Sequence, residues 1–267
     1  MIETIDIGVG SLAFERSGSG DPLLLIPGFA SGMWSWHRLT GLLAERFEVI
    51  AFDPRGVARS RIAPGAEVTI DLIAEDVVSL LGSLGIESAH VLGISFGGFV
   101  AQELALGYPE RVNRLVLAST SFGGTGHVTP SSDVLAAFAP SEVSDPEERR
   151  RQFLTMAFSP EFVENEQDVV SEFCEQRLEN VVPDEVYRQQ LASALAFDTS
   201  ERVGKILART LVLSGDRDTV VPAENSRNLA RAMHFAELRI VPGGSHMLFV
   251  ERPDIFNEAV TEFLLAR

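Results

Sequence analysis

Residues 90–100 read HVLGISFGGFV and set one serine, Ser95, between two glycines where an apolar run gives way to a helix. The run His90–Ile94 is typical of a buried strand. A sharp turn from strand to helix needs small residues around its central residue, and Gly93 and Gly97 provide them. Such a turn projects the serine hydroxyl above the sheet, near the positive end of the helix. The plainer interpretation is a tight glycine-rich turn in which Ser95 only caps the helix.

Outward from this turn, short apolar runs alternate with segments of helical period. The predicted strands are a hairpin of Ile5–Ile7 and Ser11–Arg16, then Leu23–Ile26, Glu48–Phe52, His90–Ile94, Arg114–Ala118, Thr210–Ser214 and Leu238–Val241. The predicted helices are Trp36–Leu43, Thr69–Leu84, Phe99–Leu106, Ala223–Ala232 and Asp254–Leu264. Strands that alternate with helices indicate an α/β fold, with a mostly parallel sheet covered by helices on both faces.

The alternation stops after Phe122 and resumes near residue 206. Residues 123–205 have mostly helical patterns and no confident strand, so we expect a core of residues 1–122 and 206–267 with a helical cap inserted at 123–205. The cap holds 16 acidic and 7 basic residues, so it carries −9 of the total charge of −16. We expect the run Arg149–Arg151 to be a solvated helix face. Most cap phenylalanines are expected to form the cap's own core, with a minority facing the cleft: Phe138, Phe153, Phe158, Phe162, Phe173 and Phe197.

A serine hydroxyl becomes a good nucleophile only when a base takes its proton, and an anionic partner must orient that base. Of the five histidines, His246 stands out because its loop follows a predicted strand, at the sheet edge where ligands bind. The other four have the surroundings of packed, capping or solvated histidines: His37, His90, His127 and His234. Two candidates for the acid follow the strand Thr210–Ser214. Asp216 is suited to brace the loop, and Asp218 is placed to reach a base.

With these residues in this order, the chain resembles the α/β-hydrolase family nearly end to end outside the cap. The family order of nucleophile, acid and histidine is met by Ser95, Asp218 and His246. The family pattern G-x-x-D-x-x-V-P falls on residues 215–222, which favours Asp218 over Asp216. The closing patterns G-x-H, E-x-P and F-N fall on residues 244–246, 251–253 and 256–257.

The resemblance also implies roles for two loops. The family turn D-x-R-G-x-G-x-S falls on Asp53–Ser60, with Ala58 where glycine is usual, and we interpret it as structural, with Asp53 and Arg55 bracing loops near the site. Two backbone N–H groups would form the oxyanion hole, those of Phe29 and Phe96. Pro27 stands where many relatives have histidine, which leaves the backbone donor in place. The resemblance implies no metal and no organic cofactor.

The nucleophile and loops narrow the choice of relatives. Ser95 argues against the haloalkane dehalogenases, which use aspartate, and the dienelactone hydrolases, which use cysteine. The chain lacks both the H-G-G-G loop of one esterase class and the extended glycine-rich loop of the carbon–carbon bond hydrolases. It is similar to esterases, 3-oxoadipate enol-lactonases and perhydrolases, and residues 108–112 (YPERV) look most like the enol-lactonases.

The resemblance therefore predicts a serine hydrolase that cleaves a carboxylic ester or lactone of a small, mainly apolar substrate through an acyl-enzyme on Ser95. Enol-lactone hydrolysis and perhydrolysis are the alternatives, and a ligand sensor on the same fold is a further one.

Composition limits partners and location. A net charge of −16 and a pI near 4.7 would repel phosphate backbones and anionic lipids, so we expect neither a nucleic acid nor a membrane as partner. Cys174 is the single cysteine, which excludes an intramolecular disulfide. Without a secretory signal or a long apolar run, the protein is expected to be cytoplasmic. The acidic cap would disfavour anionic substrates, so a neutral ester ranks first. No interface signature indicates an oligomeric state.

Overall fold

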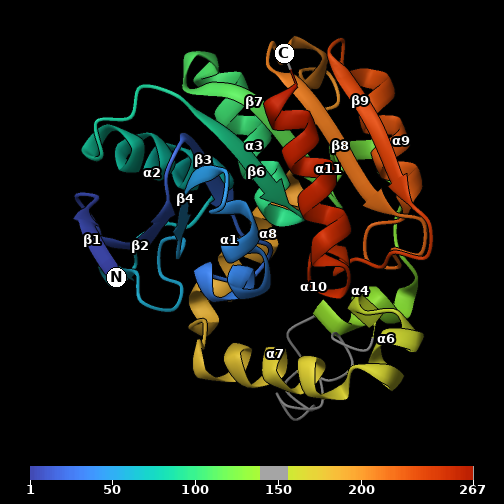
Figure 1. The fold of residues 1–267 in the computed structure, drawn as a ribbon. Coiled ribbons are helices and arrows are strands. Elements are labelled where there is room, and N and C mark those ends of the chain that lie inside the picture. Colours follow the sequence, from blue (N-terminus) through green and yellow to red (C-terminus); the bar gives the residue numbers. More distant parts are fainter. Residues whose placement is uncertain (139–155, 267) are drawn as a thin grey trace.

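The computed structural model describes residues 1–138 and 156–266, which form a mixed sheet with helices on both faces (Figure 1). The order of the strands in the sheet is β1-β2-β4-β3-β6-β7-β8-β9, with β5 paired to β2. From β4 to β9 along this order all neighbours are parallel, whereas β2 runs antiparallel to β1, β4 and β5. The strands are β1 (Ile2–Asp6), β2 (Gly10–Gly18), β3 (Asp21–Ile26), β4 (Phe47–Phe52), β5 (Arg61–Ile62), β6 (Ala89–Ile94), β7 (Val112–Ala118), β8 (Arg209–Gly215) and β9 (Ala236–Val241). The predicted α/β fold with a mostly parallel sheet is confirmed.

Two hydrophobic cores lie on opposite faces of this sheet. In β3, Leu23 and Leu25 belong to one core with α1 and α11, while Leu24 and Ile26 belong to the other with α2 and α3. Because both faces are covered, the central strands are continuous apolar runs instead of alternating ones. The helices of the core are α1 (His37–Leu43), α2 (Ile70–Ser83), α3 (Phe96–Gly107), α9 (Ala223–Ala232), α10 (Leu248–Glu251) and α11 (Pro253–Leu265).

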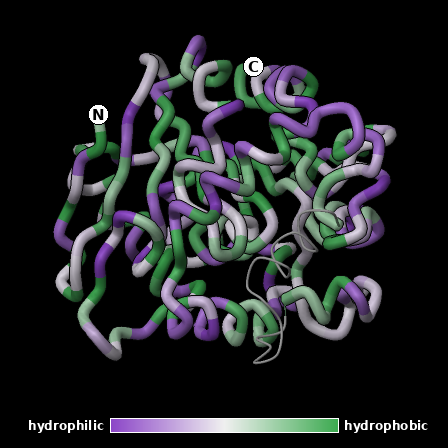
Figure 2. Tube along the Cα trace, turned by 90° about the horizontal axis from the view of Figure 1, so that it is seen from below, coloured by the Kyte–Doolittle hydropathy of each residue, from purple (hydrophilic) through white to green (hydrophobic). Residues whose placement is uncertain are grey.

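Hydropathy follows the same arrangement. Figure 2 shows green hydrophobic stretches in the interior of the molecule, while purple hydrophilic stretches are frequent at its periphery. Helix α2 illustrates the local rule: Thr69 caps it by accepting a hydrogen bond from the Leu72 N–H at 3.2 Å, and its buried face carries Ile73, Val77 and Leu80.

Most element boundaries agree with the sequence prediction to within two residues, but β1 begins at Ile2, three residues before the predicted Ile5. Helix α3 begins at Phe96, as the turn at Ser95 predicts, and so three residues before the apolar period starts at Phe99, although Gly97 and Gly98 are poor helix formers. The four-residue helix α10 and the two-residue strand β5 were not predicted, because elements this short carry no periodic signal. A 3-10 turn at Met33–Trp36 precedes α1.

The segment 123–205, which we call the cap, is helical in the residues that the structure describes. Its helices are α4 (Ser132–Phe138), α6 (Pro160–Asn165), α7 (Gln167–Glu179) and α8 (Asp184–Ala196). Figure 1 shows α4, α6 and α7 below the sheet, toward the end at which β6 and β8 terminate. The run Arg149–Arg151 and Phe153 lie outside the described residues. No described helix has the length and apolar character needed to cross a bilayer.

The cap phenylalanines do not form a core of the cap alone, which corrects the prediction. Phe158 stacks on Phe162, with ring centroids 5.5 Å apart, and meets Phe173 edge-on at 5.7 Å. However, Phe173 also packs against Trp34 at 5.0 Å. Phe197 stacks at 4.2 Å on Phe99 of α3. Among the described residues, the cap phenylalanines therefore pack against the core as well as against one another.

Candidate active site

Ser95 sits in the turn between β6 and α3 with a strained backbone. Its φ of 52° and ψ of −118° place it at positive φ, which residues with a Cβ rarely adopt. A Cβ on Gly93 would lie 2.3 Å from the Gly97 carbonyl oxygen, and one on Gly97 would lie 2.2 Å from the Ile26 carbonyl oxygen. Both positions therefore require glycine. The Ser95 side chain makes no capping hydrogen bond to α3, so the plainer interpretation of this turn as a helix cap is wrong.

His246 and Asp218 form a buried hydrogen-bonded pair on the loops after β9 and β8. The His246 Nδ1 lies 2.9 Å from Asp218 Oδ2 and 3.1 Å from Oδ1. Asp218 Oδ1 also accepts from the N–H groups of Val220 and Val221, at 2.9 and 2.8 Å. The side chain of Asp218 is 0% exposed and that of His246 is 5% exposed. A carboxylate only accepts, so Nδ1 carries a proton, and Nε2 is the nitrogen that can act as a base.

Asp216, the other acid candidate, takes a different part. Its Oδ1 accepts from the Gly243 N–H at 2.6 Å, so it braces the loop that leads to His246. The structure thus brings Asp218 to the imidazole and leaves Asp216 on the supporting loop.

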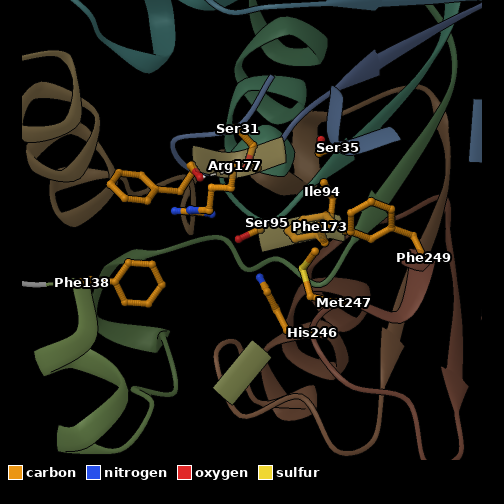
Figure 3. Close-up of a pocket in the computed structure, with 12 residues that line it drawn as sticks. Ser31, Ser35, Ile94, Ser95, Phe138, Phe173, Arg177, His246, Met247 and Phe249 are labelled. Atoms are coloured by element: carbon orange, nitrogen blue, oxygen red, sulfur yellow. Dashed lines mark hydrogen bonds between the residues drawn. The ribbon is translucent and has the colours of Figure 1, made fainter. Parts of the chain in front are cut away.

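Ser95 and His246 line one pocket, and Figure 3 shows the serine hydroxyl and the imidazole facing one another across it. The pocket encloses about 470 Å³ counted with its open mouth. The described residues that line it are Gly28, Phe29, Ser31, Ser35, Ile94, Ser95, Phe138, Phe173, Arg177, His246, Met247 and Phe249. Its walls are therefore mostly apolar and aromatic, which suits a small, mainly apolar ligand.

Phe96 follows Ser95 directly, and Phe29 belongs to the loop after β3 that borders the same pocket. Phe96 is the first residue of α3, so its N–H has no partner within the helix. The loop after β3 approaches closely, because a Cβ on Gly28 would lie 3.7 Å from the Ser95 Cβ. Phe29, the next residue, lines the pocket. Backbone N–H groups in such positions can stabilise negative charge that develops on a carbonyl oxygen.

The turn Asp53–Ser60 braces this site, as predicted. Asp53 is fully buried, and its carboxylate accepts from the N–H groups of Met33 at 2.8 Å and Arg59 at 3.0 Å. Burial raises the pKa of Asp53, and the two N–H donors act against that rise. Ala58, where glycine is usual in the family, has a φ of 46°.

Arg55 braces the same turn from the other side. It binds both carboxylate oxygens of Asp76, at 2.6 and 2.7 Å, and both side chains are almost fully buried. This bidentate geometry fixes the turn to helix α2, which carries Asp76.

Three residues with contacts at the site were missed by the sequence analysis. Arg177 of α7 lines the pocket, and Gln190 of α8 accepts a hydrogen bond from the Ala30 N–H. Glu251 accepts from the N–H groups of Ser245 and Ser159, which joins the His246 loop to the cap. The E-x-P pattern pointed to Glu251 without indicating its role, and nothing local distinguishes Arg177 or Gln190 from other polar residues of cap helices. Among the described residues no cluster of histidine, cysteine or acidic side chains could hold a metal ion.

Comparison with known proteins places this arrangement in a family. The family model of the alpha/beta hydrolase fold matches residues 21–253. A protein of Azorhizobium caulinodans named "Putative carbamate hydrolase RutD" is 30% identical over 256 residues, 96% of this chain and 96% of its own length.

Two solved structures are also similar. A hydrolase from Pseudomonas aeruginosa PA01 has a TM-score of 0.86 at 29% identity, covering 99% of this chain and 98% of its own. Est816, described as an N-acyl homoserine lactone degrading enzyme, has a TM-score of 0.85 at 27% identity, covering 98% and 100%. The chain is therefore a member of the α/β-hydrolase fold family, and its relatives make it a hydrolase.

Proposed function

We propose that this hydrolase cleaves a carboxylic ester or lactone of a small, mainly apolar substrate through an acyl-enzyme on Ser95. One observation carries the proposal: a buried imidazole, held through Nδ1 by Asp218, lines the same pocket as a serine strained at the end of β6. Nucleophile, base and orienting acid are the three groups that acyl transfer to a serine requires.

In the first half of the proposed reaction, His246 Nε2 takes the Ser95 proton as the serine oxygen attacks the substrate carbonyl. The N–H groups of Phe29 and Phe96 hold the oxyanion of the tetrahedral intermediate, and each such donor is worth on the order of 2.7–4 kcal/mol. The imidazolium then gives its proton to the leaving alcohol, and the carbonyl re-forms as the acyl-enzyme.

In the second half, water enters and His246 takes one of its protons, so that hydroxide attacks the acyl-enzyme. The same two N–H groups hold the second oxyanion. Collapse of this intermediate releases the carboxylic acid, and the proton on His246 returns to the Ser95 oxygen. Asp218 fixes the tautomer of His246 and stabilises its cation in both halves. No proton transfer in this sequence needs a group besides these three side chains.

Carbamate hydrolysis is the second candidate, because the relative from Azorhizobium caulinodans is named as a putative carbamate hydrolase. A carbamate carries nitrogen on its carbonyl, so attack by Ser95 would form a carbamoyl-enzyme. The nitrogen lone pair makes that carbonyl less electrophilic. We therefore expect hydrolysis of the carbamoyl-enzyme, which frees Ser95, to be slower than hydrolysis of an acyl-enzyme.

A matched substrate panel tests the proposal. We expect wild-type protein to turn over p-nitrophenyl acetate and a small lactone many times per molecule, with a higher kcat/KM than for the corresponding p-nitrophenyl carbamate. Ser95→Ala is expected to abolish this turnover while its circular dichroism and melting curve stay those of wild type, because the side chain makes no structural hydrogen bond to α3. Retained turnover in Ser95→Ala would refute the acyl-enzyme.

The same panel separates the remaining alternatives. A preference for an enol-lactone over every simple ester would indicate enol-lactone hydrolysis. Peracid formation in the presence of hydrogen peroxide would indicate perhydrolysis, in which peroxide replaces water as acceptor of the acyl group. A rise in melting temperature with a ligand, without any turnover, would indicate a sensor.

A further inference from the structure

Three polar side chains of helix α8 in the cap each accept a hydrogen bond from a backbone N–H group of the core, two of them in loops and one at the start of α2. The pairs are Gln189 Oε1 with the Val68 N–H at 2.6 Å, Gln190 Oε1 with the Ala30 N–H at 2.9 Å, and Ser193 Oγ with the Ile70 N–H at 3.1 Å. Gln190 differs from the other two because its partner belongs to the loop that borders Ser95. Gln190 is also 1% exposed, so this bond is sheltered from water.

The hydrogen bond from the Ala30 N–H to Gln190 holds the Phe29–Ala30 peptide plane, which is next to the proposed oxyanion donor, the Phe29 N–H. A peptide unit is planar, so holding the Ala30 N–H fixes the plane that it shares with the Phe29 carbonyl. On the other side of this plane, the Phe29 carbonyl oxygen accepts from Ser31 Oγ at 3.3 Å. The Gly28 carbonyl oxygen accepts from the Ser31 N–H at 3.3 Å. Because a trans peptide points its C=O and N–H in opposite directions, these bonds together set the direction of the Phe29 N–H.

The loop needs such support because its backbone is not in a locally favoured conformation. Ala30 has a φ of 50°, in the left-handed region that residues with a Cβ rarely adopt. Conformations of this kind persist only where surrounding contacts hold them. Helix α8 supplies two such contacts, since Tyr187 packs on the Phe29 ring with centroids 4.7 Å apart and Gln190 holds the next N–H.

We propose that Gln190 is a positioning residue. Through it, the packing of cap helix α8 against the core controls the direction of the Phe29 N–H. The inference rests on the proposed function, because it assigns Gln190 a part in stabilising the oxyanion. Negative charge develops on the carbonyl oxygen only as the tetrahedral state forms. A misdirected Phe29 N–H therefore lowers kcat and leaves KM nearly unchanged.

The variant Gln190→Met tests this role, because methionine has a similar length and shape and no carboxamide oxygen. We expect kcat for p-nitrophenyl acetate to fall by about tenfold or more, with KM within about twofold of wild type. Gln190→Glu keeps an accepting oxygen at the same place and is expected to recover most of kcat.

Two matched controls remove the same kind of bond from the same helix. Gln189→Met and Ser193→Ala each free a core N–H that lies outside the oxyanion loop, so they are expected to keep kcat within about twofold while lowering the melting temperature like Gln190→Met. A trifluoromethyl ketone, which forms a tetrahedral adduct with Ser95, should bind Gln190→Met more weakly by the same factor by which kcat falls.

A full kcat in Gln190→Met, or an equal fall in Gln189→Met, would overturn the inference and leave the proposed function intact. If Gln190→Met does not fold, Gln190→Asn makes the same comparison, since it keeps a buried amide but withdraws the oxygen by one methylene. Absence of Ser95-dependent turnover in wild-type protein would instead overturn the proposed function, and this inference with it.

Discussion

At the scale of single residues, two aspartates that are two positions apart have separate environments. Asp218 is closed off from water and shares its Oδ1 among the imidazole and two backbone N–H groups. Asp216 instead holds the Gly243 N–H at the molecular surface. The carboxylate that contacts the ring can control its tautomer, and the other can only support the loop.

Replacing each aspartate by asparagine distinguishes these two parts. We expect Asp218→Asn to lower kcat for an ester by about 10⁴-fold, because an amide N–H facing Nδ1 favours the tautomer that carries the proton on Nε2. Asp216→Asn keeps an oxygen that can accept from Gly243, so a loss below about tenfold is expected. Steady-state kinetics at pH 8 checks both variants. Equal damage from the two substitutions would show that the acid has been wrongly assigned.

At the scale of elements, strand β6 carries a second histidine whose surroundings are quite different. His90 lies five residues before Ser95, roughly 16 Å along the strand. It is 7% exposed, its ring meets Phe47 edge-on at 6.1 Å, and its Nδ1 has no hydrogen-bond partner among the described residues. Burial lowers the pKa of His90 below 6.5; the nearby Arg114 acts in the same direction, and Asp21 opposes it.

This lowered pKa makes stability depend on pH. In the unfolded chain His90 takes up its proton near pH 6.5, whereas in the folded protein it does so only at lower pH. The unfolded state therefore binds more protons in that window, and the free energy of unfolding falls as the pH drops below about 6.5. His90→Leu removes this contribution.

We expect the variant His90→Leu to lose less stability than wild type between pH 7 and pH 5, as measured by urea unfolding at each pH. Its ester kinetics at pH 7 should be unchanged, because His90 lies at the far end of β6 from the pocket. The free energy of unfolding of the variant should still fall somewhat with pH, since burial also lowers the pKa of His127. Parallel stability curves for variant and wild type would mean that His90 titrates alike in both states.

Elements differ in how far local sequence specifies them. The parallel strands were predicted well because burial on both faces leaves an unbroken apolar run such as Leu23–Ile26. The apolar period alone places the start of α3 at Phe99, because Gly97 and Gly98 interrupt that period, whereas the strand-to-helix turn at Ser95 places it near Phe96, as observed. The presence of the two glycines is explained by the Ile26 and Pro27 carbonyls close to Gly97 and by the Thr120 side chain beside Gly98. Contacts between distant segments override propensity at such positions.

At the scale of the whole molecule, charge acts on substrates before they bind. The net charge is −16, and −9 of it lies in the cap over the sheet end. Within the pocket the charge differs, because the described lining includes Arg177 and no carboxylate. Repulsion of an anionic substrate would therefore arise from the surface field during approach and not from the pocket walls.

The effect of this field on substrate approach can be measured with two esters that differ only in a carboxylate far from the ester bond. We expect the kcat/KM of the anionic ester to be roughly tenfold lower than that of the neutral ester at 10 mM salt. The difference should narrow at 0.5 M salt, where the Debye length falls to a few ångströms. The variant Arg177→Gln serves as a control for attraction inside the pocket. Equal rates for the two esters at low salt would contradict the ranking of neutral substrates first.

Periodicity and motif spacing predict the order of strands and helices along the chain, the turn at Ser95, and the loops that carry His246 and Asp218. These predictions rest on local physics: burial sets the period of each element, and a sharp turn from strand to helix needs small residues such as Gly93 and Gly97. The tertiary structure alone decided which side chains meet. Gln190 reaches the Ala30 N–H across 160 residues of chain, and His246 reaches Asp218 across 28. The spacing of apolar residues along a helix shows which face of the helix is buried. Which residues that face contacts depends on how the cap packs on the sheet.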